Sequence, residues 1–181
     1  MDNMSRIRGV SRRFRYLFIL LMIITPIVPV IIWMSYNNLS LGVRDQLYRN
    51  LYVTPIPSMS LSTRLLACLA SLIPSVIAAI GFFHLNRLFG LYEQGRIFLR
   101  ENVRYYRRLG YIIIFAMVGS RIYTTLASTI VTLNLPPGQR TLSVVFSSDD
   151  VAQLVIGMMV IVVSWIMDIG RELHEEQQLT V

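Results

Sequence analysis

Four apolar runs, each about as long as a membrane-crossing helix, constrain this chain more than any other feature. A helix needs about 20 apolar residues to cross the hydrocarbon core of a bilayer. The runs cover residues 16–36, 65–85, 109–133 and 151–169. Only 15% of the residues are charged, against roughly 25% in a soluble domain. The sequence therefore predicts an all-α polytopic membrane protein, in which residues 1–181 form a single domain with four transmembrane helices in one bundle.

The arginines between these runs predict the orientation of the helices. All 17 basic residues are arginines, and the net charge is +7. Twelve of them lie on one side of the predicted membrane: five before the first run, six in the Arg-rich segment 86–108 and one in the tail 170–181. The other side has only Arg44, Arg49, Arg64 and Arg140. Because cytoplasmic loops carry the excess of basic residues, we expect both termini to be cytoplasmic and the arginines to contact anionic lipid headgroups.

Arg121 is the charged residue that fits least well into its run. It lies twelve positions into the third run, which on a helix is about 18 Å deep and near the bilayer midplane. A central arginine costs at least ~2.5 kcal/mol to insert, so it should face the interior of the bundle. We expect an intramembrane polar node of Arg121, Thr25 and Ser75, helped by the Ala70 carbonyl that Pro74 leaves free. An anion or ligand site and a structural lock both remain open readings.

Catalytic and metal-binding patterns are missing from the sequence. The two histidines, His84 and His174, lack cysteine or carboxylate neighbours at metal-ligand spacing, and Cys68 is the only cysteine. There is no nucleophile–base motif and no glycine-rich phosphate loop. We therefore expect no enzymatic activity, no cofactor and no metal. Direct binding of nucleic acid is also not expected, because the arginine clusters adjoin the apolar runs.

The Arg-rich segment and the tail have opposite charge and should emerge on the same side of the membrane. In the first, arginines alternate with aromatic residues, a pattern typical of a helix at the membrane interface. In the second, three glutamates oppose one arginine. The candidate docking surface consists of Gly95, Phe98, Glu101, Asn102, Arg104, Arg108, Glu172, Glu175, Glu176 and Leu179. It is either a docking surface for a protein or an anionic lipid, or an ordinary positive anchor.

The same two segments carry a resemblance to a known family. The residues concerned are Gly95, Ile97, Phe98, Glu101, Asn102 and Gly110 in the first, and Leu179, Thr180 and Val181 in the second. With them the chain resembles the bacterial membrane family catalogued as domain of unknown function 2975. The resemblance implies a four-span protein of the bacterial inner membrane, without an established activity. It also implies a small helix-turn-helix regulator as a partner. Leu99 departs from the family pattern, because a Thr or Ser there would cap the next helix.

Two functions from different classes fit these observations. The first is a regulatory or sensory membrane protein that docks a soluble cytoplasmic partner, with a helix-turn-helix regulator as the candidate. The alternative is a small transporter, or a resistance or immunity protein that recognises a membrane-active compound. Arg121 and the prolines at positions 26, 29 and 74 would matter most for the alternative. The residues leave the ligand, the partner and the oligomeric state open.

Overall fold

Five α-helices make up the fold of the computed structural model. It describes all residues except 1–2, 55, 57, 98, 137 and 180–181, and the side chains of 3–5 and 174–179 are likewise not described. The helices are α1 (Asn3–Met34), α2 (Leu41–Leu51), α3 (Leu61–Glu93), α4 (Arg100–Thr132) and α5 (Ser148–Leu179), with a short 3-10 turn at Tyr36–Asn38. All but α2 are long and apolar enough to cross a membrane. The predicted all-α, four-span architecture is therefore confirmed.

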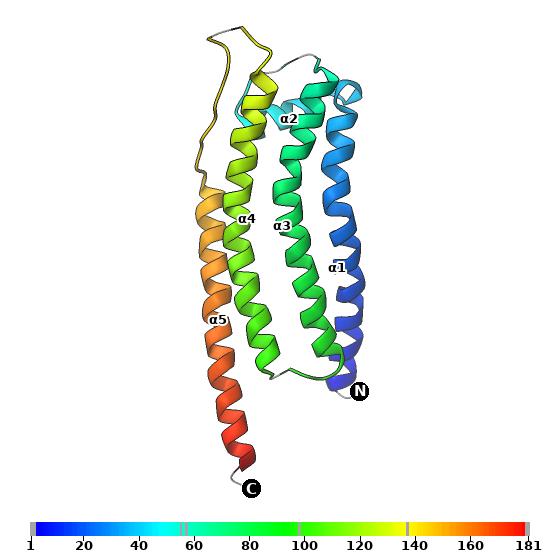
Figure 1. Ribbon diagram of the computed structural model, residues 1–181. Helices are drawn as coiled ribbons and strands as arrows, with labels where there is room; N and C mark the ends of the chain where they lie inside the picture. Colours follow the sequence, from blue (N-terminus) through cyan, green and yellow to red (C-terminus); the bar gives the residue numbers. More distant parts are fainter. Residues whose placement is uncertain (1–2, 55, 57, 98, 137, 180–181) are drawn as a thin grey trace.

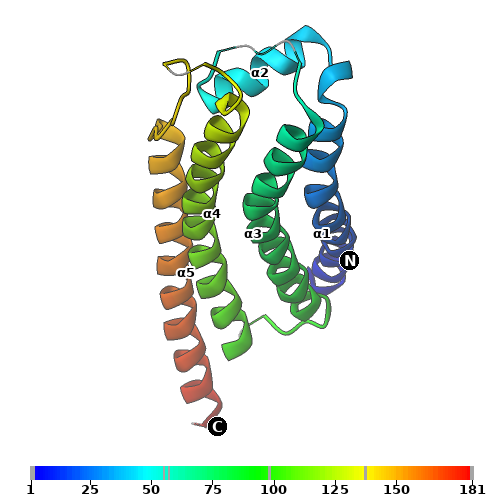
Figure 2. The same cartoon turned by 45° about the horizontal axis from the view of Figure 1, so that its top comes forward.

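The four long helices pack against one another in chain order. The main contacts within the described residues join α1 to α3, α3 to α4, and α4 to α5. Figure 1 shows the resulting row, with α1 and α5 on its two sides and with the start of α1 and the last turns of α5 at the same end. We call this the Arg-rich end. The opposite end is crossed by α2, as Figure 2 shows, and we call it the cap end.

Glycines allow the helices in this row to approach closely. A Cβ on Gly110 of α4 would lie 2.5 Å from Ile161 Cγ1 and 2.9 Å from the Gly157 carbonyl oxygen of α5. A Cβ on Gly119 would lie 2.5 Å from Ile77 Cδ1 of α3. Small residues are typical of helix contacts in lipid, where dispersion contacts between closely packed backbones drive association. The small residues of α4 therefore fix its position between α3 and α5.

The cap end holds the main buried apolar cluster. Trp33, Tyr36, Tyr48 and Leu51 are almost completely buried there. The hydroxyls of Tyr36 and Tyr48 both donate to the Ile56 carbonyl, which ties α1, α2 and the chain leading to α3 together. The sequence predicted only a polar stretch here. Helix α2 was missed because it is short and amphipathic, and only its buried face shows that it belongs to a folded cap.

Candidate functional site

The turn between α3 and α4 shapes the Arg-rich end. Gly95 has a positive φ of 76°, which a side chain would disfavour. The fully buried Asn102 donates its amide to the carbonyls of Arg96, at 2.8 Å, and Ile97. The helix begins at Arg100 although Leu99, at the N-cap position, provides no side-chain cap. Gly95 and Asn102 of the predicted docking surface thus support the turn, while Phe98 lies outside the described residues.

The exposed face of α4 carries a column of arginines. Arg100, Arg104 and Arg108 are all exposed and are spaced four residues apart, so they lie on one side of the helix. Glu101 is exposed beside them, whereas Val103 and Leu109 are buried on the opposite face. In the described part of the chain, none of the three arginines has an ion pair. Of the predicted docking surface, Arg104, Arg108 and Glu101 therefore remain accessible to a partner.

The Asp168 carboxylate links α5 to α4 at the Arg-rich end. Its Oδ2 lies 3.8 Å from Nη2 of Arg107, and its Oδ1 accepts a hydrogen bond from Nε of Arg171 at 3.1 Å. Glu172 is 63% exposed and pairs with the neighbouring Arg171. The predicted members Glu175, Glu176 and Leu179 have side chains outside those described. Helix α5 continues beyond the start of α4, as Figure 1 shows, so the tail extends past the arginine column.

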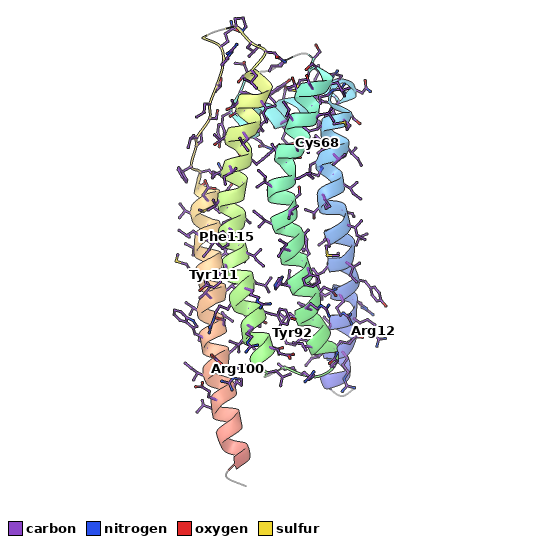
Figure 3. All side chains as sticks on the ribbon, in the orientation of Figure 1. Arg12, Cys68, Tyr92, Arg100, Tyr111 and Phe115 are labelled. Atoms are coloured by element: carbon purple, nitrogen blue, oxygen red, sulfur yellow. The ribbon has the colours of Figure 1, made fainter. Side chains whose placement is uncertain are left out.

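A second set of ion pairs holds α1 against α3 at the same end. Arg12 Nε lies 2.8 Å from Glu93 Oε1, and Arg15 Nη1 lies 2.6 Å from Glu93 Oε2. Hydrogen bonds from Arg12 and then from Arg15 lower the pKa of the Glu93 carboxyl, which lies eight residues beyond the apolar run of α3. Close by, the hydroxyls of Tyr92 and Tyr106 are 2.7 Å apart. Figure 3 shows Arg12 and Tyr92 at the same end as Arg100.

A polar cavity opens beside the arginine column. It has a volume of about 480 Å³, and its lining includes residues of α1, α3 and α4. The polar lining residues are Arg15, Asn86, Arg87, Gln94, Glu101 and Tyr105. Glu101 and Tyr105 flank Arg104 on α4, so the cavity and the column belong to one surface. This surface can accept an acidic partner along the column and a side chain in the cavity.

Arg121 forms a separate cluster toward the cap end. Its Nε lies 3.0 Å from Asp150 Oδ1, and its Nη1 donates to the Val145 carbonyl at 2.8 Å. The side chain of Asp150 is only 5% exposed, and that of Arg121 is 22% exposed. The second Asp150 oxygen accepts from the backbone N–H of Ser147 at 2.7 Å, which caps the start of α5. The pair therefore fixes the first turn of α5 on the side of α4.

This partner differs from the one that the sequence predicted. Thr25 donates to Leu21 and Ser75 donates to Ser71, each within its own helix. Among the described residues, no hydrogen bond links Arg121 to either of them. The reason is that the chain after α4 does not stay at the end of the helix but returns along it, which brings Asp150 down to Arg121. Residues 142–147, Leu-Ser-Val-Val-Phe-Ser, do not alternate regularly between apolar and polar, so the sequence carries no clear signal of this return.

The described part of the chain gives little support for a metal site or for a disulfide. No three His, Cys, Asp or Glu side chains there lie close enough to hold a metal ion. Cys68 is buried and unpaired.

An apolar cavity of about 370 Å³ lies between α3 and α4, with Phe82, Leu109 and Ala116 in its lining. Its walls offer a bound molecule a defined shape and apolar contacts.

Comparisons with known proteins agree with the motifs around the turn and the tail. No curated protein and no solved structure matches the chain. One family model matches residues 11–181, which covers α1 from residue 11 onward and the other three spanning helices. Because the match covers nearly the whole chain, the protein belongs to the family described as Protein of unknown function (DUF2975).

Proposed function

We propose that this chain is a regulatory or sensory protein of a bacterial inner membrane that docks a soluble partner at its Arg-rich end. The arginine excess at this end supports its location in the cytoplasm. The observation that carries the proposal is the column of Arg100, Arg104 and Arg108, which is exposed and has no ion pair in the described residues. The proposed role is binding, without a catalytic step.

The contrast with the other arginines supports this role. Arg12 and Arg15 pair with Glu93, Arg107 pairs with Asp168, and Arg121 pairs with Asp150. These arginines are committed to holding the helices together, whereas those of the column are not. Residues four apart on a helix are separated by about 6 Å along its axis, so the column is about 12 Å long. An acidic stripe on one helix of a partner matches that length.

The candidate partner is a small helix-turn-helix regulator, the kind that the family resemblance implies. Acidic residues on such a protein would be steered to the column by long-range attraction, which affects the association rate more than the final affinity. The cavity of about 480 Å³ beside the column would receive a partner side chain. Sequestering a regulator at the membrane would couple an event at the cap end to transcription.

The test compares two variants with the same change in charge. Arg100→Glu/Arg104→Glu/Arg108→Glu alters the column, and a matched triple Glu variant alters the exposed α1 positions 6, 8 and 13 at the same end. Each is placed in lipid nanodiscs, and binding of a purified helix-turn-helix regulator, the kind that the family resemblance implies, is measured by interferometry. We expect the column variant to lose binding and the control to keep most of it. Equal loss in both would indicate a lipid anchor, and no binding by the wild type would reject the docking of this regulator.

A second candidate function rests on the apolar cavity between α3 and α4. Its volume of about 370 Å³ and its apolar lining suit a membrane-active compound rather than a charged substrate. Ala116→Phe would fill part of the cavity without touching the arginine column. Loss of protection against such a compound, with regulator binding intact, would favour this resistance role. Retained protection would reject it.

A further inference from the structure

The chain between α4 and α5 binds along the side of α4. We call residues 141–147 the flap. Thr132 Oγ1 accepts from the N–H of Thr141 at 3.1 Å, and Ser128 Oγ accepts from the N–H of Ser143 at 3.2 Å. Deeper along α4, Thr125 donates to the Ser143 carbonyl at 3.2 Å, and Arg121 donates to that of Val145. The flap thus descends along a polar stripe of α4, visible in Figure 1 as the long thread beside that helix.

The flap is extended, because four residue steps along it run beside eleven residue steps along α4. From Thr132 to Arg121 the helix rises about 16 Å, and the four steps from Thr141 to Val145 cover about 13 Å only when fully extended. Side chains then alternate between the two faces. Ser143 is buried, whereas Leu142, Val144 and Phe146 are 67%, 61% and 74% exposed. The face turned away from the protein is therefore entirely apolar.

The spacing of charges along the helices shows how deep this apolar face lies. On α3, Arg64 and Arg87 are 23 residues apart, about 34 Å, which spans a hydrocarbon core of about 30 Å. On α4, Arg107 and Arg121 are only 14 residues apart, about 21 Å. If Arg107 marks one membrane boundary, Arg121 lies about 9 Å inside the other. The flap lies beside the part of α4 between Arg121 and that boundary.

We propose that the flap lies in the bilayer leaflet at the cap end, with Phe146 and Val144 against lipid acyl chains and Leu142 near the headgroups. The backbone groups on the outward edge of the flap support a shallow position. In an extended chain, alternate residues direct their backbone groups to opposite edges. Thr141, Ser143 and Val145 bond to α4, and Ser147 bonds to Asp150 of α5. The even-numbered residues have no backbone hydrogen bond within the described chain. Those groups need water, which reaches the headgroup region but not the hydrocarbon core. The backbone of the flap therefore stays at the headgroup level, and only its apolar side chains reach the acyl chains.

This placement explains how an ion pair is kept at that depth. The flap covers Arg121 and Asp150 on one side, and its Val145 carbonyl binds the guanidinium directly. The apolar side chains of the flap continue onto α5, where Val151 is 63% exposed. Lipid therefore meets apolar side chains of the flap outside a polar seam, while the exposed Ser148 and Asp149 at the start of α5 lie toward the headgroups. The inference does not depend on the proposed docking function.

Spin-label accessibility tests the placement. Nitroxides are attached to single cysteines at Leu142, Val144 and Phe146 in a Cys68→Ser background, in liposomes of phosphatidylethanolamine and phosphatidylglycerol. Oxygen concentrates in the bilayer, and a nickel chelate stays in water. Met159→Cys, on a spanning part of α5 that is 62% exposed, is the lipid control, and Leu41→Cys, 77% exposed on α2, is the water control.

We expect Phe146 to resemble the Met159 control, Leu142 to be intermediate, and nickel broadening to fall steadily from Leu142 to Phe146. If all three labels resemble the Leu41 control, the flap lies in water and the inference is wrong. If both reagents are excluded from all three labels, a protein surface such as a second copy covers the flap. That result would equally overturn the lipid contact.

Discussion

Removing Arg121 should destabilise the protein through the carboxylate that it leaves behind. Asp150 is 5% exposed, and its other oxygen is occupied by the Ser147 cap. Breaking a buried pair by removing one partner costs about 3–5 kcal/mol, because an uncompensated charge remains. The Arg121 side chain is 22% exposed, so the pair is not completely enclosed by protein. We therefore expect Arg121→Leu to lower the free energy of unfolding by about 3 kcal/mol, at the low end of that range.

The double variant Arg121→Leu/Asp150→Asn should recover most of that loss. The amide oxygen introduced at position 150 can still accept from the Ser147 N–H, so the start of α5 stays capped. Removing both charges also removes the cost of burying them, and such replacements are often nearly neutral. We therefore expect the double variant to lie within about 1 kcal/mol of the wild type. The coupling energy is then at least about 2 kcal/mol, and any loss caused by Asp150→Asn alone adds to it.

The assay is unfolding in mixed micelles by titration with a denaturing detergent, followed by helix content. The wild type, both single variants and the double variant complete a double-mutant cycle. If the two single losses simply add, Arg121 and Asp150 do not interact and the geometry described for α4 and α5 is refuted. A neutral Arg121→Leu would show that the pair contributes nothing.

Two further substitutions test the packing of α4, and the same unfolding titration measures both. Asn102→Ala removes two hydrogen bonds from a buried turn and should lower the free energy of unfolding by about 1–3 kcal/mol. The control Arg104→Ala, on the exposed face, should change it by no more than about 0.5 kcal/mol. Equal effects would contradict the supporting role of Asn102. Gly157→Val puts side-chain atoms where a Cβ would already lie 2.7 Å from Ile114, so it should destabilise by about 1–3 kcal/mol. The matched control Gly170→Ala, on the same helix with nothing within 4 Å, should be neutral or slightly stabilising; a neutral Gly157→Val would mean that α4 and α5 do not meet there.

The spanning helices could be predicted from the sequence because their signal is local. Each apolar run is long enough to cross lipid, and no tertiary contact is needed to recognise it. The start of the third spanning helix near Leu99 and the turn at Gly95 were also predictable, since a glycine marks the required backbone conformation. The family resemblance rested on the same short motif.

The Arg121 cluster and the cap could not be predicted because their signals are not local. Asp150 was expected in a loop outside the membrane, and nothing in the neighbouring residues says that the loop turns back along α4. The serines and threonines of α4 are ordinary residues for a membrane helix until the flap is placed beside them. In the cap, Tyr48 is buried only because α2 folds onto the ends of the other helices.

Cysteine labelling of the two ends tests the central claim most directly. Single cysteines at the exposed positions Gln94 and Gln139 are introduced in a Cys68→Ser background, and a membrane-impermeant maleimide is applied to intact spheroplasts and to inverted vesicles. The account predicts labelling of Gln139→Cys only in spheroplasts and of Gln94→Cys only in inverted vesicles. Labelling of Gln94→Cys from outside the cell would place the arginine column away from the cytoplasm and would contradict the account.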